Sequence, residues 1–331
     1  MKPGRKTGRK SYVYTTTFSL RFAASYASVA TISALLQAPA FFSSCVKAPS
    51  PVETQIYIQS TKNAITQPVD LFFFDTEGPM NLDSYQEIHV AGTSSLYGVS
   101  GAGDKHIVAL SGLVSTWLDI RTYGSLCKRT FSLENDSPEA PLLVAETRVG
   151  DAASRRVGLQ LHPMLSCIRI RSVSCNFSGR PYAGDTFHNN KLFLSYAGTE
   201  CFPVGTGDRL PVSWVNAGPL DSMDCARFPH PDMLMQEGLG TLSEKKKTPD
   251  RRFYCYPHPD TRLVLGGTVG DRPCYYPIPL SGLEPGKSYT LDIAIHRMGS
   301  PDPDIPAESG AMDLQISAAP WYPGEQQTVK F

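Results

Sequence analysis

Short runs of apolar and β-prone residues, separated by turn-forming segments, recur along most of the chain. The run Val69–Asp75 reads VDLFFFD, and it is bounded by Pro68 and by the Glu-Gly-Pro segment at 77–79. A continuous apolar run of this length, rich in β-prone residues, predicts a strand that is buried on both faces. Residues 107–110 predict a second buried strand for the same reason.

Further short, β-prone runs predict strands at 191–196, 253–256, 261–269, 274–280, 289–295 and 312–317. In the run 289–295 the apolar residues alternate with the others, as in a strand with one buried face. The pair Gly270-Asp271 lies between two of these runs and predicts a hairpin turn. Between 157 and 177 the alternation changes phase at Ser172, which predicts a β-bulge and places Cys175 on the apolar face.

Helical signals are weak. Residues 123–133 predict one short helix from the spacing of Leu126, Arg129 and Thr130. Residues 203–250 are rich in glycine, proline and charge, which predicts a long connection. No internal repeat is visible, and the pattern as a whole predicts an all-β chain of two β-sandwiches in series.

The first 44 residues have the pattern of an export signal. A basic segment comes first, residues 22–42 carry no charge, and no acidic residue occurs before Glu53. Ser43 and Ser44 directly precede Cys45, as in a bacterial lipobox, so we predict cleavage before Cys45 and lipidation of its thiol. The alternatives are an ordinary signal peptide, or a chance cysteine after a wrongly assigned start. Residues 45–55 are polar and contain proline, which predicts a tether between the lipid and the folded protein.

Composition narrows the class of partner. The whole chain has 31 basic and 31 acidic residues, and six of the basic ones lie in the leader. The mature chain would therefore be mildly acidic, which argues against a nucleic-acid partner. With 27 glycines and 27 prolines, the chain also has the turn-rich character of an all-β protein.

No cluster of residues predicts catalysis, a cofactor or a metal. The eight cysteines include no CxxC pair, and seven remain if Cys45 is lipidated, so we expect buried single thiols rather than a disulfide framework. Two Pro-His-Pro-Asp segments, at 229–232 and 257–260, could supply metal ligands, but no third ligand follows at a fixed spacing. We expect two proline-rich loops there, and no enzyme activity.

Several segments resemble the fimbrillin-like subunits of Bacteroidetes type V pili. They are VDLFFFDTEG after the lipobox, PLLVAE at 141–146 followed by LQLHPMLSCIRIRSV, NFSGRPYAG at 176–184 before KLFLSY, and the closing segments from TRLVLGG onward. The resemblance covers most of residues 56–331 and rests on diffuse patterns. It implies two transthyretin-like β-sandwich domains, at 56–200 and 201–331, with the strand at 191–196 as the last of the first domain.

The same resemblance implies a function and a place. The protein would be a lipid-anchored subunit of a surface fimbria at the cell outer membrane, joined to other fimbrial subunits by β-strand exchange, with no cofactor. In the stalk class a protease cuts after an arginine beyond the first strand, but no arginine lies between Cys45 and Arg121. The first strand, at 56–58, would then stay attached, which favours an anchor or minor subunit.

Two points stay open in the sequence. Residues 321–331 alternate, and they could engage the next subunit or close their own sandwich. The alternative function is a glycan-binding β-sandwich lipoprotein, which needs a platform of exposed aromatic residues. Its candidates are Trp117, Trp214 and Trp321.

Overall fold

The structure is a computed structural model. It describes residues 52–59, 67–89, 95–112, 117–150, 155–205, 213–215, 225, 228–245, 247, 249–308 and 310–321. The predicted leader, Cys45 and residues 322–331 lie outside these ranges.

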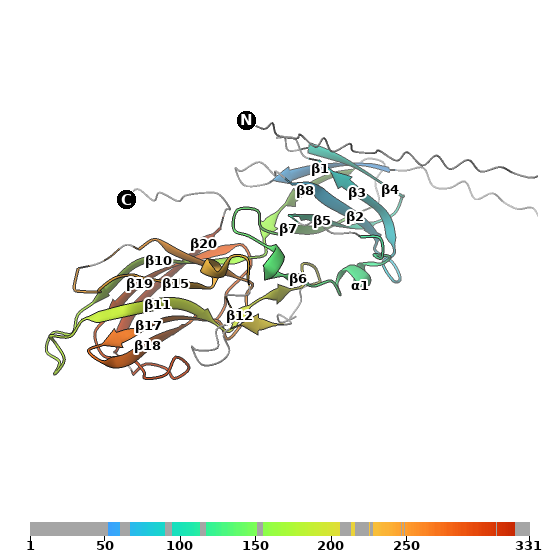
Figure 1. Ribbon diagram of the computed structural model, residues 1–331. Helices are drawn as coiled ribbons and strands as arrows, with labels where there is room; N and C mark the ends of the chain where they lie inside the picture. The colour runs from blue at the N-terminus through green and yellow to red at the C-terminus, as the bar shows by residue number, and fades with distance from the viewer. Residues whose placement is uncertain are drawn as a thin grey trace, which may run out of the picture. The chain divides into compact units, whose positions relative to one another are not determined.

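The first sandwich consists of two sheets (Figure 1). The larger sheet has the order β3-β2-β5-β7-β9, with bounds Leu82–Ile88, Val69–Asp75, Lys105–Ser111, Leu143–Val149 and His162–Pro163. The smaller sheet has the order β4-β1-β8, with bounds Ser95–Ser100, Val52–Gln59 and Arg155–Gln160. The strand β1 begins at Val52 rather than after residue 55, so the last residues of the predicted tether are part of the sheet.

Both faces of the larger sheet are covered. Leu71 and Phe73 of β2 pack toward the smaller sheet in one apolar cluster. Phe72 and Phe74 point the other way and pack against the segment after β5, where the Phe72 ring lies 5.2 Å from that of Trp117. The two predicted buried strands are therefore confirmed, because a strand with core on both sides has no polar face.

The described part of the segment that covers the outer face contains one short α-helix. Helix α1 spans Tyr123–Leu126, with Thr122 as its N-cap, and it is followed by β6 (Phe131–Ser132) and the 3-10 turn η1 (Leu133–Asn135). The predicted helix over 123–133 is thus wrong beyond Leu126. Phe131 pairs instead with Cys201 of β13 (Glu200–Cys201), a long-range contact that overrides the local spacing.

The second sandwich also has two sheets, of four strands each (Figure 1). One has the order β16-β10-β19-β20, with bounds Arg251–Cys255, Ser166–Cys175, Lys287–Ile295 and Met312–Pro320. The other has the order β15-β11-β17-β18, with bounds Met235–Glu237, Phe187–Ser195, Arg262–Val269 and Arg272–Pro279. Short elements complete the described chain: β12 (Ala197–Gly198), β14 (Trp214–Val215) and the 3-10 turn η4 (Pro231–Met233).

The pairing of β10 and β11 corrects the sequence-based division. The strand at 191–196 was expected to end the first domain, but it forms part of β11 and pairs with β15 and β17. β10 likewise pairs with β16 and, in parallel, with β19. The strands from Ser166 onward therefore belong to the second sandwich. Alternation shows which face of a strand is buried and carries no information about its partner strand.

Three local predictions in the second sandwich are confirmed. The register between β10 and β19 shifts between Ile170 and Ser172, at the predicted bulge. Residues 270 and 271 form the two-residue loop between β17 and β18, and Gly270 has the positive φ of 58° that the first loop position of a type II′ turn requires. In β19 the alternate residues from Tyr289 to Ile295 are buried.

Candidate assembly site at the first strand

The first strand occupies the centre of its sheet. β1 pairs antiparallel with β4, from Val52 opposite Ser100 to Tyr57 opposite Ser95, and parallel with β8, from Thr54 opposite Arg155 to Gln59 opposite Gln160. We call the space that β1 fills between β4 and β8 the first-strand slot. Both backbone edges of β1 are engaged in this slot, so the strand completes the sheet rather than lying on its rim.

The floor of the slot is apolar. Ile56 is fully buried, and it belongs to the cluster that includes Phe73 of β2 and Val157 of β8. Gly98 of β4 lies opposite Thr54, and a Cβ atom there would collide with the Phe73 ring. The absence of a side chain at Gly98 thus lets the two sheets pack closely beneath the slot.

The outer edge of β4 is closed by side chains from the facing sheet. The Ser84 hydroxyl and the Gln86 amide both donate to the Val99 carbonyl oxygen, at 2.6 and 2.7 Å. The Val99 N–H donates to the Gln86 side-chain oxygen at 3.4 Å. These bonds satisfy the outward-facing backbone groups of Val99, which would otherwise be open to another strand.

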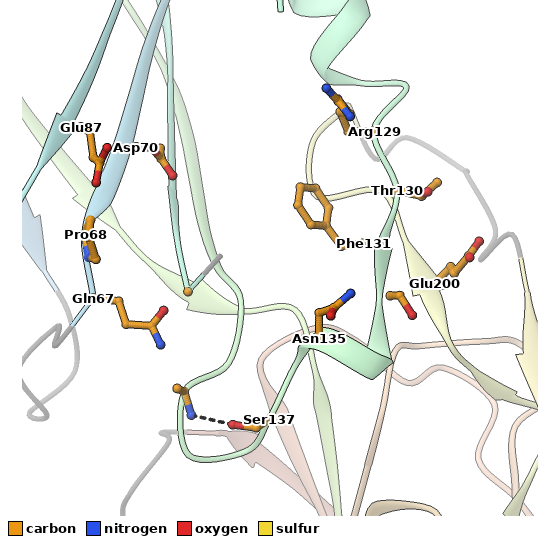
Figure 2. Close-up of a pocket in the computed structure, with 13 residues that line it drawn as sticks. Gln67, Pro68, Asp70, Glu87, Arg129, Thr130, Phe131, Asn135, Ser137 and Glu200 are labelled. Carbon is orange, nitrogen blue, oxygen red and sulfur yellow. Dashed lines mark hydrogen bonds between the residues drawn. The ribbon is translucent and has the colours of Figure 1, made fainter. Parts of the chain in front are cut away.

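A polar cavity of about 960 Å³ lies beside this sandwich (Figure 2). Asp70 and Glu87 line one side, and Arg129 and Phe131 line the other. The Tyr85 hydroxyl donates to Asp70 Oδ1 at 2.6 Å, while burial raises the pKa of the Asp70 carboxyl. Arg129 forms an ion pair with Asp119. Asp70 and Arg129 are thus each held by a neighbouring side chain, and neither forms a nucleophile with an adjacent base.

A second polar cluster joins α1 to the larger sheet. Glu146 Oε2 accepts a hydrogen bond of 3.0 Å from the Tyr123 hydroxyl and lies 3.2 Å from His106 Nε2. The contact with His106 lowers the pKa of Glu146, and burial raises the pKa of Tyr123. The Tyr123 hydroxyl is hard to ionise and is hydrogen-bonded to the Glu146 carboxylate, so it stabilises the fold and is a poor nucleophile.

The structure places the sequence-predicted candidates as follows. Cys45 lies outside the described residues. His230 and Asp232 are exposed, whereas His258 is buried, and its ring lies 5.1 Å from that of Trp214. Among the residues that the structure describes, no three His, Cys, Asp or Glu side chains gather as metal ligands would.

The aromatic candidates for a glycan platform do not share a surface. Trp117 and Trp321 are buried, at 6% and 7% exposure, while Trp214 is 46% exposed. The Trp321 ring packs against that of Tyr254 at 5.4 Å, and Trp117 packs against Phe72. Two of the three tryptophans are therefore core residues.

The seven cysteines that follow Cys45 in the chain, from Cys127 to Cys274, are buried, as the sequence predicted. Burial raises the pKa of the Cys175 and Cys255 thiols to about 12, which keeps both protonated and unreactive at neutral pH. The placement of Cys175 on the apolar face of β10 is confirmed.

Asp136 is one of several buried polar groups that the sequence did not predict. Asp136 is 4% exposed and accepts hydrogen bonds from Tyr256 Oη at 2.8 Å, Leu142 N at 3.0 Å and Ser137 N at 2.8 Å. In the sequence it stands before Ser-Pro, where an aspartate is typical of a turn. No local signal indicates its distant partner Tyr256.

Comparison with known proteins places the fold. No protein-family model and no curated protein matches the sequence. A candidate cell adhesion protein from Bacteroides eggerthii has a solved structure with a TM-score of 0.65 and 17% identity, covering 83% of this chain and 97% of that one. A second, from Parabacteroides distasonis, has a TM-score of 0.62 and 12% identity, covering 84% and 99% of the two chains.

A fimbrilin from Porphyromonas gingivalis is also similar in structure. Its TM-score is 0.58 at 12% identity, and the match covers 83% of this chain and 99% of that one. The chain therefore has the all-β fold of these fimbrillin-like proteins, as the sequence resemblance predicted. The further likeness to transthyretin stays a prediction.

Proposed function

We propose that this chain, which shares its fold with a fimbrilin and with candidate cell adhesion proteins of the same bacterial group, is a structural or assembly subunit of a cell-surface fimbria. The observation that carries the proposal is the extent of the match. It runs through both sandwiches and covers 97% to 99% of the compared chains. A shared fold does not by itself determine a function. The proposal is therefore made at the level of a structural or assembly subunit, and the first-strand slot, which β1 of the same chain fills, bears on the subunit's place in the fibre.

The proposal treats the protein as non-catalytic. The titratable clusters around Asp70, Glu146 and Asp136 are each held in hydrogen bonds that stabilise the fold. Its partners would be other fimbrial subunits, joined by strand exchange, in which an extended segment of one subunit pairs within the sheet of another.

A lipid at Cys45 would hold the protein at the outer membrane. Six residues, 46–51, separate Cys45 from the start of β1, and six extended residues span at most roughly 20 Å. A lipid at this position would therefore keep the first sandwich close to the membrane surface. Within the described ranges, no helix combines the length and apolar character that a bilayer span requires.

The lipid proposal predicts a clear result for Cys45→Ala. Cells grown with a palmitate analogue should label the wild-type protein, and the variant should lose the label and leave the membrane fraction. Cys127→Ala is the matched control, because this cysteine is buried and should not affect labelling. Label that persists in Cys45→Ala would refute the lipid anchor while leaving the fimbrial proposal untouched.

Within a fimbria, we propose that this subunit is an anchor or minor subunit that keeps its first strand. β1 fills the slot from within the same chain, and no arginine lies between Cys45 and Arg121 to mark a cut beyond it. A retained strand leaves no open groove for a neighbour's strand, which suits a subunit at the end of a fibre.

N-terminal sequencing of the protein recovered from surface fibres tests this role. We expect the mature chain to begin at the lipid-blocked Cys45 and to retain β1. A mature N-terminus after Gln59, for example through cleavage at Lys62, would show that the slot is emptied and would make the protein a stalk or tip subunit.

The alternative, a glycan-binding lipoprotein, has weaker support. Burial of Trp117 and Trp321 leaves Trp214 as the exposed member of the three candidates. Saturable binding of the purified protein to a panel of polysaccharides, abolished by Trp214→Ala, would favour this alternative over the fimbrial one.

A further inference from the structure

The two sheets of the second sandwich end in edge strands of opposite character. β18 ends one sheet and β20 ends the other. An edge strand presents unpaired N–H and C=O groups that can template pairing with another chain, and proteins commonly block such edges. The strand registers show which backbone groups of β18 and β20 face away from their sheets.

The free edge of β18 is blocked by prolines. In the tight hairpin, Val269 and Arg272 form the closing pair, so the even residues of β18 bond to β17 and the odd residues face outward. Three of these outward positions are Pro273, Pro277 and Pro279, which have no N–H to donate. The fourth, Tyr275, exchanges two backbone hydrogen bonds of 2.8 Å with Ser300.

The free edge of β20 has no such protection among the described residues. Trp321 N donates to Gly286 O at 2.7 Å, and His296 N donates to Ala311 O at 2.8 Å, so the odd residues of this strand bond to β19. The backbone groups of Met312, Leu314, Ile316 and Ala318 then point away from the sheet. The strand is nine residues long, with Pro320 at its end and one charged residue, Asp313.

The side chains along this edge are arranged for pairing. The same even residues lie opposite the buried Tyr289, Leu291, Ile293 and Ile295 of β19, so they form an apolar row on the inner face. Ile316 in this row is 46% exposed, which shows that the inner face is incompletely covered there. A groove of about 270 Å³ lies at the start of the strand, where Met312, Pro277 and Pro279 line it together with the charged residues Arg262, Asp304 and Glu308.

We infer that β20 pairs edge to edge, in antiparallel orientation, with β20 of a second copy of this chain. In the register with a two-fold axis at Gln315, Leu314 faces the partner copy's Ile316, and Met312 faces the partner copy's Ala318. The pairs on the inner face are then apolar throughout, with Leu314 against Ile316 and Met312 against Ala318, and Asp313 faces Ser317 rather than a like charge. The two four-stranded sheets become one continuous sheet. This pairing does not depend on the fimbrial proposal.

A cysteine at the two-fold axis tests the register. Gln315 is exposed and would face its own copy in a non-hydrogen-bonded pair, where the Cα atoms approach to roughly 4.5 Å, within the range of a disulfide. In the Cys45→Ala background, Gln315→Cys should form a disulfide dimer under mild oxidation. Ala319→Cys is the matched control, since it is equally an outward-facing position on β20 but lies far from its own copy in this register.

A proline on the edge tests the hydrogen bonds. Ile316→Pro removes one outward N–H from each copy and leaves the hydrogen bonds between β20 and β19 intact. The prolines of β18 are placed in the same way, at outward positions that do not bond to β17. We expect the full-length Cys45→Ala protein to dimerise reversibly in light scattering, and Ile316→Pro to weaken dimerisation roughly tenfold or more. Circular dichroism should show an unchanged fold.

Several outcomes would overturn the inference. A protein that stays monomeric at high concentration, equal cross-linking at residues 315 and 319, or dimerisation unaffected by Ile316→Pro would each do so. Dimerisation that appears only after removal of residues 322–331 would also overturn it, because the edge in the full chain would then be occupied by its own C-terminal segment.

Discussion

Replacing Ile56 with alanine is expected to destabilise the protein by about 2 to 5 kcal/mol. Ile56 is fully buried in the apolar cluster between the two sheets of the first sandwich, which also contains Phe73. Truncation would leave a cavity at the floor of the first-strand slot, and the sheets cannot close it because β4 and β8 are held apart by the β1 backbone.

Urea unfolding of the mature protein measures this loss. Tyr57→Thr is the matched control, since Tyr57 is 36% exposed on the opposite face of the same strand and threonine keeps the preference for extended backbone. The control should change stability by about 0.5 kcal/mol or less. Equal effects of the two substitutions would show that β1 does not fill the slot in the mature protein, which would also undermine the anchor proposal.

The second large effect concerns Asp136. Its carboxylate accepts three hydrogen bonds, one of them from Tyr256, which lies far along the chain, directly after β16. Asp136→Ala would leave the Tyr256 hydroxyl and two backbone N–H groups without an acceptor. We expect a loss of about 3 to 5 kcal/mol, because each buried orphan costs on the order of 1 to 3 kcal/mol.

Asp136 also predicts a pH dependence. Burial raises the pKa of its carboxyl from 3.8 to about 6 in the folded protein. Between these values the folded state binds the proton more tightly than the unfolded state does. The contribution of Asp136 to the free energy of unfolding is therefore fully present below about pH 4 and is lost as the pH rises through 6. The free energy of unfolding falls by about 3 kcal/mol over this range.

Asp136→Asn isolates this contribution. Asparagine keeps an acceptor for the two backbone N–H groups and cannot ionise. The free energy of unfolding of the variant, relative to that of the wild type, should therefore increase between pH 4 and pH 7. Denaturant unfolding at both pH values measures it, and Tyr256→Phe serves as the companion variant that keeps the charge and removes one donor. A difference that is independent of pH would refute the role assigned to this carboxyl.

Local pattern in the sequence was sufficient for the parts of the fold that depend on one strand at a time. The apolar run at β2, the alternation in β19, the bulge at Ser172 and the Gly270 hairpin are each specified by adjacent residues. The alternation of apolar residues after Ser172 likewise predicts the burial of Cys175. These features are predictable because a strand alternates its side chains with a period of two, whatever its neighbours are.

Pairing between distant strands was decided only by the tertiary structure. The sequence assigned the strand at 191–196 to the wrong sandwich, extended α1 past Leu126, and gave no sign that Asp136 and Tyr256 are partners. It did contain the prolines of β18, but their effect on the sheet edge depends on which residues face outward. Alternation determines which side chains are buried, whereas the choice of neighbouring strand depends on the packing of the whole sandwich.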